Sequence, residues 1–206
     1  MVLGEKGLGK TFTAIRTAAD NPGSIFYIRA LAEWTTRWMW SDLITELGFS
    51  PERGIEAKFR QLENILLEKE KILIIIDEID LVLMKRTLIN SVRDLFDKTR
   101  CPIVLIGYPE TENRLRTYGP LIDRVTEHMK FERLTKADVK LAVGTFSEVP
   151  FTAAACEELH RKSEKRIRTV RSAVLKLERM ARVNCWKEIM PEHVAGYFSQ
   201  FPREKT

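Results

Sequence analysis

The feature that most constrains the fold is a glycine-rich segment close to the N-terminus. Gly4 to Thr11 reads Gly-Glu-Lys-Gly-Leu-Gly-Lys-Thr and fits the pattern GxxxxGK[ST] at every fixed position. Glycines let backbone N–H groups curl around a phosphate without clashes from Cβ atoms. The helix that follows would point its N-terminal N–H groups at the same anion. The segment therefore predicts a strand–loop–helix unit that grips the phosphates of a nucleoside triphosphate.

Two side chains at the end of this loop have predicted roles. Lys10 is expected to reach the β- and γ-phosphates, and the Thr11 hydroxyl is expected to bind Mg²⁺. The second half of such a site is a carboxylate at the end of a buried strand. The apolar run Ile72–Ile76 is followed by Asp77 and Glu78. Asp77 is predicted to hold Mg²⁺ through water, and Glu78 to polarise the attacking water as the catalytic base.

Short β-branched and apolar runs alternate with helical patterns along the first two thirds of the chain. The predicted strands are Met1–Leu3, Ser24–Ala30, Ile72–Ile76, Ile103–Ile106 and Met129–Phe131. The predicted helices are Lys10–Ala19, Glu33–Leu47, Glu56–Lys69 and Leu88–Lys98. Strands that are apolar on both faces belong inside a parallel sheet covered by helices. The alternation predicts a doubly wound α/β fold of the P-loop type, with a parallel five-stranded sheet. Asp80 is interpreted as a helix cap.

The pattern becomes wholly helical after Leu134. Thr135 followed by Asp138 predicts a capping box at the start of this region. The predicted helices are Lys136–Phe146, Thr152–Lys162, Ile167–Val183 and Pro191–Phe198. We place a boundary near Arg133, with a nucleotide-binding core over residues 1–132 and a small helical lid over residues 133–206.

Composition narrows the class of protein. The 206 residues are 44% hydrophobic, which is too apolar for a disordered chain. No apolar run approaches the roughly 20 residues of a membrane span, and no signal peptide is evident. Cys101, Cys156 and Cys185 form no CxxC pair, so no zinc site is expected. These features predict a cytoplasmic protein with no membrane partner.

The net charge of +5 permits nucleic-acid binding without proving it. A basic cluster stands out in the predicted lid, although a solvated helix face is an equal alternative for it. The cluster comprises Arg161, Lys162, Lys165, Arg166, Arg168 and Arg171. Weaker candidates for a DNA backbone contact are Arg29, Arg37 and Lys85. Trp34 and Trp38 are predicted to share a helix face in the core or at a subunit contact, with base stacking as the alternative.

The loop and the two carboxylates together resemble an AAA+ ATPase. The stretch Val92–Gly107, which reads VRDLFDKTRCPIVLIG, is similar to the B-type transposition ATPases of phage Mu and related elements (TniB/TnsC-like). The tryptophan-rich segment Glu33–Gly48 is also similar. Members of that family usually carry a region before the phosphate loop, so this sequence is expected to be either a fragment or a minimal version.

The resemblance implies an ATPase that uses ATP and Mg²⁺ and binds double-stranded DNA. It implies a homo-oligomer, either a ring or a filament, which selects target DNA, delivers it to a transposase and stimulates strand transfer. It places such a phage or mobile-element protein in the bacterial host cytoplasm. One alternative is a regulatory switch that binds ATP to assemble with a protein partner and does not use DNA. A small-molecule kinase is a weaker alternative, because Asp77-Glu78 and a helical lid fit hydrolysis better.

The resemblance also assigns roles to individual residues. Tyr108 takes the place of the polar sensor, where the family more often has Asn, Thr or Ser. Arg124 matches an arginine finger offered to the neighbouring subunit's ATP, with Arg114 and Arg116 as competitors. Arg168 matches the lid arginine that touches the γ-phosphate, with Arg171 as its alternative. The full predicted nucleotide-binding set is Gly4, Glu5, Lys6, Gly7, Leu8, Gly9, Lys10, Thr11, Phe12, Tyr108 and Arg168.

Overall fold

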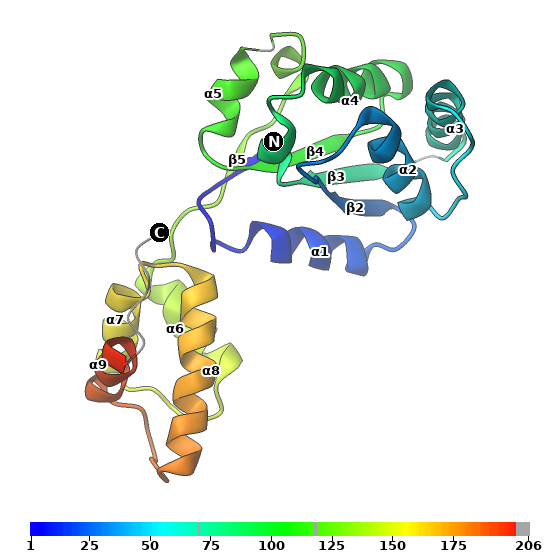
Figure 1. Ribbon diagram of the computed structural model, residues 1–206. Helices are drawn as coiled ribbons and strands as arrows, with labels where there is room; N and C mark the ends of the chain where they lie inside the picture. The colour runs from blue at the N-terminus through cyan, green and yellow to red at the C-terminus, as the bar shows by residue number, and fades with distance from the viewer. Residues whose placement is uncertain (70, 118, 201–206) are drawn as a thin grey trace. The chain divides into compact units, whose positions relative to one another are not determined.

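The computed structural model describes residues 1–69, 71–117 and 119–200 (Figure 1). These residues form two compact units. The first comprises Met1–Glu5 and Lys10–Phe131, and the second comprises Lys6–Gly9 together with the chain from Glu132 onward. Each unit has its own hydrophobic core and is described by itself.

A parallel five-stranded sheet forms the centre of the first unit, as the sequence predicts. Its strands are β1 (Val2–Leu3), β2 (Ile25–Arg29), β3 (Leu73–Asp77), β4 (Ile103–Gly107) and β5 (Met129–Lys130). They lie in the order β2-β3-β4-β1-β5, and every neighbouring pair is parallel. The carboxyl ends of all strands therefore meet at one edge, where ligands of open α/β sheets bind. The register places Arg29 opposite Asp77, the last residue of β3.

Helices cover both faces of this sheet (Figure 1). They are α1 (Lys10–Asp20), α2 (Thr36–Glu46), α3 (Ile55–Glu68), α4 (Arg86–Thr99) and α5 (Thr111–Arg116), with short 3₁₀ turns η1 (Ile79–Val82) and η2 (Ile122–Arg124). Alternate residues of β3 point to opposite faces. Ile74 and Ile76 pack with the buried faces of α2, α3 and α4, while Ile75 packs with Ala14 of α1. The apolar run of β3 is thus explained by burial on both sides.

The predicted start of the tryptophan-rich helix is wrong. Helix α2 begins at Thr36, not at Glu33, because Thr35 is its N-cap and accepts a hydrogen bond from the Trp38 N–H. Trp34 therefore lies before the helix and does not share a helix face with Trp38. Its ring is 1% exposed, and its indole Nε1 donates to Asp42 Oδ2 at 2.8 Å. Trp38 is 44% exposed.

The second unit is a helical bundle. Its helices are α6 (Lys136–Phe146), α7 (Ala153–Lys162), α8 (Ile167–Val183) and α9 (Pro191–Gln200). The capping box is confirmed, because Thr135 and Asp138 each accept the other's backbone N–H. Val139, Leu159 and Leu177, from α6, α7 and α8, are completely buried against one another's helices. Across the described part of the chain, no helix combines the length and apolar character that crossing a membrane requires.

Candidate active site

The phosphate loop joins β1 to α1. Gly7 and Gly9 adopt φ values of +86° and +102°, which residues with a Cβ rarely adopt. Helix α1 begins at Lys10, so the unpaired N–H groups of its first turn follow the loop directly. The Lys10 ammonium donates to the Gly4 carbonyl and, at 3.0 Å, to the Glu5 carbonyl. The predicted strand–loop–helix arrangement is present.

A hydrogen bond joins the end of the loop to β3. Thr11 Oγ1 donates to Asp77 Oδ2 at 2.7 Å, although the two residues are 66 positions apart in the sequence. Asp77 is 1% exposed, and its other oxygen, Oδ1, accepts from the Glu78 N–H at 2.8 Å. A hydroxyl and a carboxylate are the hard oxygen ligands that Mg²⁺ prefers. The two predicted metal-binding side chains are therefore adjacent and chemically suited to that ion.

Sequence reasoning missed a third partner of Asp77. The phenol of Tyr27, on β2, donates to Asp77 Oδ2 at 3.0 Å, beside the bond from Thr11. Burial and the neighbouring Asp77 carboxylate raise the pKa of Tyr27 well above its usual range, so the phenol stays protonated and remains a donor. Tyr27 thus helps to fix the orientation of the predicted metal-binding carboxylate. Only the register of β2 against β3 reveals this contact.

Glu78 lies in a different environment from its neighbour Asp77. Its backbone is left-handed, with φ of 54°, and its side chain is 30% exposed. Arg29 NH2 donates to Glu78 Oε2 at 2.7 Å, from the end of β2. This bond raises the pKa of the Arg29 guanidinium above its usual value. The ion pair occupies one carboxylate oxygen of the predicted catalytic base and restrains its side chain.

A small polar cluster follows β4. Asp80 does not cap its own helix, contrary to the prediction, because the N-cap of η1 is Glu78. Its carboxylate instead accepts hydrogen bonds from the Tyr108 N–H at 3.0 Å and from the Thr111 hydroxyl. A Cβ at Gly107 would meet both Asp80 and Thr111, so only glycine fits there. The cluster fixes the backbone at Tyr108, the predicted sensor position.

Tyr108 also faces the phosphate loop. The Lys10 ammonium lies 5.4 Å from the centroid of the Tyr108 ring, which is a cation–π distance. Phe12, by contrast, is 75% exposed on α1, which is unusual for a phenyl ring. The two aromatic members of the predicted nucleotide-binding set thus have different surroundings in the structure.

The candidate arginine fingers differ in their partners. Arg124 forms a two-pronged pair with Asp97 of α4, with Nε–Oδ1 and NH2–Oδ2 distances of 2.7 Å, and donates to the Pro120 carbonyl. Arg116 pairs with Glu112 at 2.7 Å. Arg114 is exposed and forms no ion pair within the described ranges. In this conformation, Arg124 would have to leave Asp97 to serve a neighbouring subunit.

Within the second unit, the lid arginine lies against the tip of the phosphate loop. The Arg168 N–H donates to the Gly7 carbonyl at 3.1 Å, at the start of α8. A Cβ on Gly7 would come within 3.6 Å of the Arg168 Cβ. The Arg168 side chain itself is exposed.

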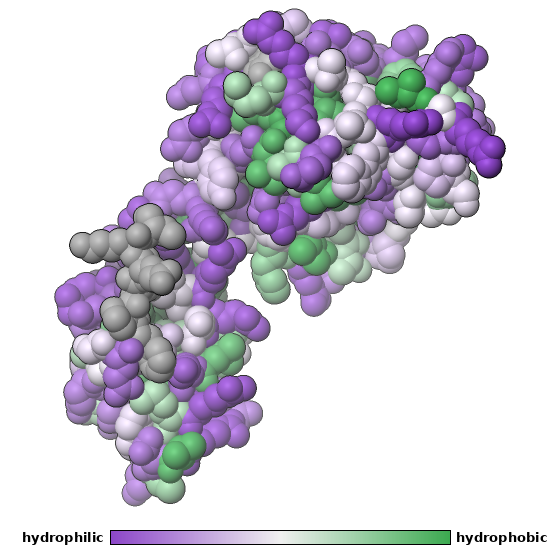
Figure 2. Space-filling model, viewed as in Figure 1, coloured by the Kyte–Doolittle hydropathy of each residue, from purple (hydrophilic) through white to green (hydrophobic). Residues whose placement is uncertain are grey.

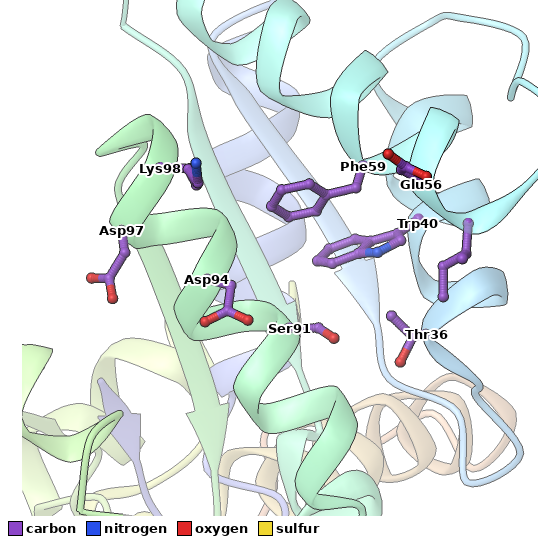
Figure 3. Close-up of a pocket in the computed structure, with 9 residues that line it drawn as sticks. Thr36, Trp40, Glu56, Phe59, Ser91, Asp94, Asp97 and Lys98 are labelled. Atoms are coloured by element: carbon purple, nitrogen blue, oxygen red, sulfur yellow. The ribbon is translucent and has the colours of Figure 1, made fainter.

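A pocket of about 530 Å³ lies between α2, α3 and α4 (Figure 3). Trp40 and Phe59 form its apolar wall, with ring centroids 5.7 Å apart. Its lining includes Asp97, the partner of Arg124, but none of the predicted nucleotide-binding residues. The pocket is therefore separate from the candidate active site.

A family model described as an AAA domain matches residues 1–115, which is more than half of the chain. The chain belongs to this AAA domain family. The observed order of strands, phosphate loop and paired carboxylates is thus the AAA+ form of the P-loop fold. No curated protein sequence matches the chain.

Solved structures share this fold at low sequence identity. The Aeropyrum pernix ORC2 protein in its ADPNP–ADP complexes aligns with a TM-score of 0.77 and 14% identity, over 100% of this chain and 62% of its own. The Aeropyrum pernix ORC1 protein in complex with DNA aligns with a TM-score of 0.70 and 14% identity, over 97% of this chain and 58% of its own. A mutant of Thermotoga maritima RuvB aligns with a TM-score of 0.68 and 17% identity, over 98% of this chain and 62% of its own. The chain thus spans about six-tenths of the length of each of these proteins.

Proposed function

We propose that the chain is an ATP-dependent DNA-binding ATPase that oligomerises on target DNA and assists a transposase in target selection and strand transfer. The observation that carries the ATPase part is the hydrogen bond from Thr11 to Asp77, with Glu78 next in the chain. It brings the phosphate loop and the two carboxylates to one edge of the sheet. Positioning and electrostatic stabilisation are the main requirements of phosphoryl transfer.

Each residue has one part in the proposed reaction. The loop N–H groups and Lys10 bind the phosphates, and Glu78 accepts the proton of the attacking water. Mg²⁺, held by Thr11 and Asp77, would neutralise charge on the β- and γ-phosphates when bound. Arg124 acts on the ATP of a neighbouring copy, and Arg168 contacts the γ-phosphate of its own.

The pair between Arg29 and Glu78 makes the proposed ATPase slow at rest. The guanidinium holds Glu78 Oε2 at 2.7 Å, so the base must be released before it accepts a proton. DNA or partner binding is the step that we expect to release it. The proposed ATPase is therefore expected to be stimulated by DNA or by a partner.

Two separate observations support DNA as the partner. A structural neighbour, the Aeropyrum pernix ORC1 protein, is described in complex with DNA. In addition, residues 1–131 contain equal numbers of acidic and basic side chains, so the whole net charge of +5 comes from residues 132–206. Net positive charge gathered in one unit is the electrostatic footprint of nucleic-acid binding. The transposase part rests on the resemblance of Val92–Gly107 and Glu33–Gly48 to the transposition ATPases.

The second candidate is a regulatory switch that assembles with a protein partner without using DNA. The restrained Glu78 favours it, because a switch needs slow hydrolysis. The ring of Tyr108 beside Lys10, where the family more often has a small polar sensor, favours it as well. Co-purification with a partner and no retention on DNA would select this function.

Electron microscopy with DNA tests the proposal. The protein is imaged with duplex DNA, once without nucleotide and once with a non-hydrolysable ATP analogue, and DNA-free samples serve as controls. Rings or filaments on DNA only with the analogue are the expected result. Assemblies that form with the analogue but ignore DNA would replace the proposal with the switch. Stimulation of strand transfer, measured with the purified transposase, then tests the transposition role.

A further inference from the structure

The second unit carries its charge unevenly. Helix α8 contains Arg168, Arg171, Lys176, Arg179 and Arg182, against a single acidic residue, Glu178. The visible face of this unit is mostly hydrophilic, with separate hydrophobic residues between (Figure 2). The buried side of α8 is apolar, which leaves its basic residues on the solvent side.

The helical spacing places all five of these basic residues on one side of the helix, and Arg182, the last of them, is held by ion pairs to Glu148 and Glu178. At 3.6 residues per turn, Arg168, Arg171, Lys176 and Arg179 fall within an arc of about 140°. They span about 16 Å along the helix axis, at 1.5 Å per residue. All four are exposed. We call this set the basic face of α8.

Salt bridges within the unit engage Arg182, which lies on the same side of α8, and two further arginines. Arg182 is held by Glu148 and Glu178, at 2.7 and 2.9 Å. Arg161 pairs with Glu158 at 2.6 Å, and Arg166 with Glu164 at 3.3 Å. The basic cluster read from the sequence is therefore partly neutralised within the unit.

The arginines of the basic face have no such partners. Arg168, Arg171 and Arg179 form no ion pair within the part of the chain that the structure describes. Arg171 lies over the ring of Phe146, 5.9 Å from its centroid, and remains exposed. Stacking on an aromatic face supports a guanidinium without neutralising its charge. Positive charge on α8 is therefore available to an external anion.

We propose that the basic face of α8 binds the phosphate backbone of double-stranded DNA through Arg171, Lys176 and Arg179, with Arg168, the proposed γ-phosphate contact, at the end of the face. This inference rests on the proposed DNA-binding function and names the surface that performs it. Arginines outnumber lysines on the face, and a guanidinium fork matches phosphate oxygens in two-pronged geometry. A duplex carries one charge per 1.7 Å of axis, so a face about 16 Å long meets several phosphates at once.

The surroundings favour a polyanion over a folded protein partner. Between the arginines lie only Ser172 and the half-exposed Leu175, which is 39% exposed. A stable protein interface needs a buried apolar centre, and this face has none of that size. Contacts to phosphates carry no sequence information, so the binding should be independent of sequence.

A salt titration of DNA affinity tests the surface. The whole chain, loaded with a non-hydrolysable ATP analogue, is titrated with a duplex of arbitrary sequence at several salt concentrations. The test variant replaces Arg171 and Arg179 with glutamine. Its matched control replaces Lys140 and Lys187, which are exposed in the same unit, and so loses the same charge. A third variant, with lysine at positions 171 and 179, keeps the charge.

The expected result is a loss confined to the test variant. Its affinity should fall about tenfold or more at low salt, and the slope of log affinity against log salt should shrink by about two, one for each lost phosphate contact. The control and the charge-keeping variant should retain the wild-type slope. An unchanged circular dichroism spectrum and unfolding midpoint show that the test variant is folded, and the analogue is kept at a saturating concentration for every variant.

Three other results would overturn the proposal. Equal DNA affinity and salt slope in the wild type and the test variant would show that DNA is not bound by α8. The proposed DNA-binding function would not be contradicted by that result. Absence of DNA binding by the wild type would remove the proposed function and the surface together. Loss of binding to polyglutamate in the test variant, with DNA binding intact, would assign the face to an acidic protein.

Discussion

Two adjacent carboxylates at the end of β3 have opposite surroundings. Asp77 is buried and accepts hydrogen bonds from Thr11, Tyr27 and the Glu78 N–H. Glu78 is partly exposed, and its carboxylate pairs with Arg29. A carboxylate that accepts several hydrogen bonds is fixed in place and is suited to bind a metal ion. A partly solvated carboxylate can accept a proton from water. The division of roles between the two residues follows from these surroundings.

Replacing Glu78 with glutamine should separate binding from turnover. Glutamine keeps the shape and can accept a hydrogen bond, but it cannot accept the proton of the attacking water. ATP should bind with unchanged affinity, while the turnover number falls about a hundredfold or more. Equilibrium nucleotide binding and phosphate release measure the two quantities. Glu33→Gln, on an exposed residue in the same unit, is the matched control, and normal turnover by E78Q would remove Glu78 from the base role.

Replacing Arg29 with alanine should raise the basal turnover. The lost ion pair is partly exposed, with side chains 58% and 30% accessible, so its worth is about 0.2–1 kcal/mol. Without the guanidinium, Glu78 is free to act as the base, so the variant should hydrolyse ATP about two- to fivefold faster in the absence of DNA. Steady-state phosphate release gives the rate.

Arg60→Ala serves as the control for the Arg29 variant. It removes an exposed pair with Glu56 on α3, away from the candidate active site, and should leave turnover unchanged. A lower rate in Arg29→Ala would show that Arg29 supports the reaction and does not restrain it.

The sequence predicts the chemistry of single residues better than their partners. Lys10, Thr11, Asp77 and Glu78 come from local patterns, and the structure brings Thr11 and Asp77 together. Tyr27 was missed because nothing near it in the sequence indicates Asp77. The register of β2 on β3 sets that contact, and register depends on packing across the whole sheet.

At the scale of elements, local sequence patterns predict most of the helices and strands. Helices α6 and α8 have the predicted bounds, because the capping box and the apolar period define them. Helix α5 was not predicted, since its six residues are too few to show a period. The cap prediction for Asp80 is wrong because Tyr108 and Thr111, distant in sequence, bond to its carboxylate.

The start of α2 gives a prediction about stability. Trp34 is buried in the turn before the helix and donates to Asp42, so Trp34→Phe loses a hydrogen bond and leaves space beside it. The free energy of unfolding should fall by about 1–3 kcal/mol. Trp38→Phe, at an exposed site on the same helix, should change it by less than about 0.5 kcal/mol. Urea unfolding measures both, and equal effects would contradict this account of Trp34.

At the scale of the whole molecule, the proposed reaction needs more than one copy. Arg124 is bound to Asp97 of its own chain, and burial does not hold it there, since the pair is about one-third exposed. An exposed pair of this kind is weak, so a neighbouring ATP can compete for the guanidinium. We therefore expect oligomer assembly to exchange the Asp97 pair for a phosphate contact.

Mixing two inactive variants tests this exchange. Arg124→Ala lacks the finger and Glu78→Gln lacks the base, so each alone should hydrolyse ATP poorly. In mixed assemblies, a head-to-tail contact can combine an intact Glu78 with an intact Arg124, and about a quarter of the contacts should do so. Phosphate release from the mixture should exceed that of either variant. A mixture no more active than its parts would argue against a finger shared between subunits.

The central claim is that the γ-phosphate of ATP controls DNA binding. One titration tests it most directly: the affinity of the Glu78→Gln protein for duplex DNA, measured with ATP and again with ADP. This variant should hold ATP without hydrolysing it, so the two samples differ only in that phosphate. We predict at least about tenfold tighter DNA binding with ATP, a difference of about 1.4 kcal/mol, weakening steeply with salt. Equal affinity with ATP and ADP, or no DNA binding at low salt with ATP, would contradict the account.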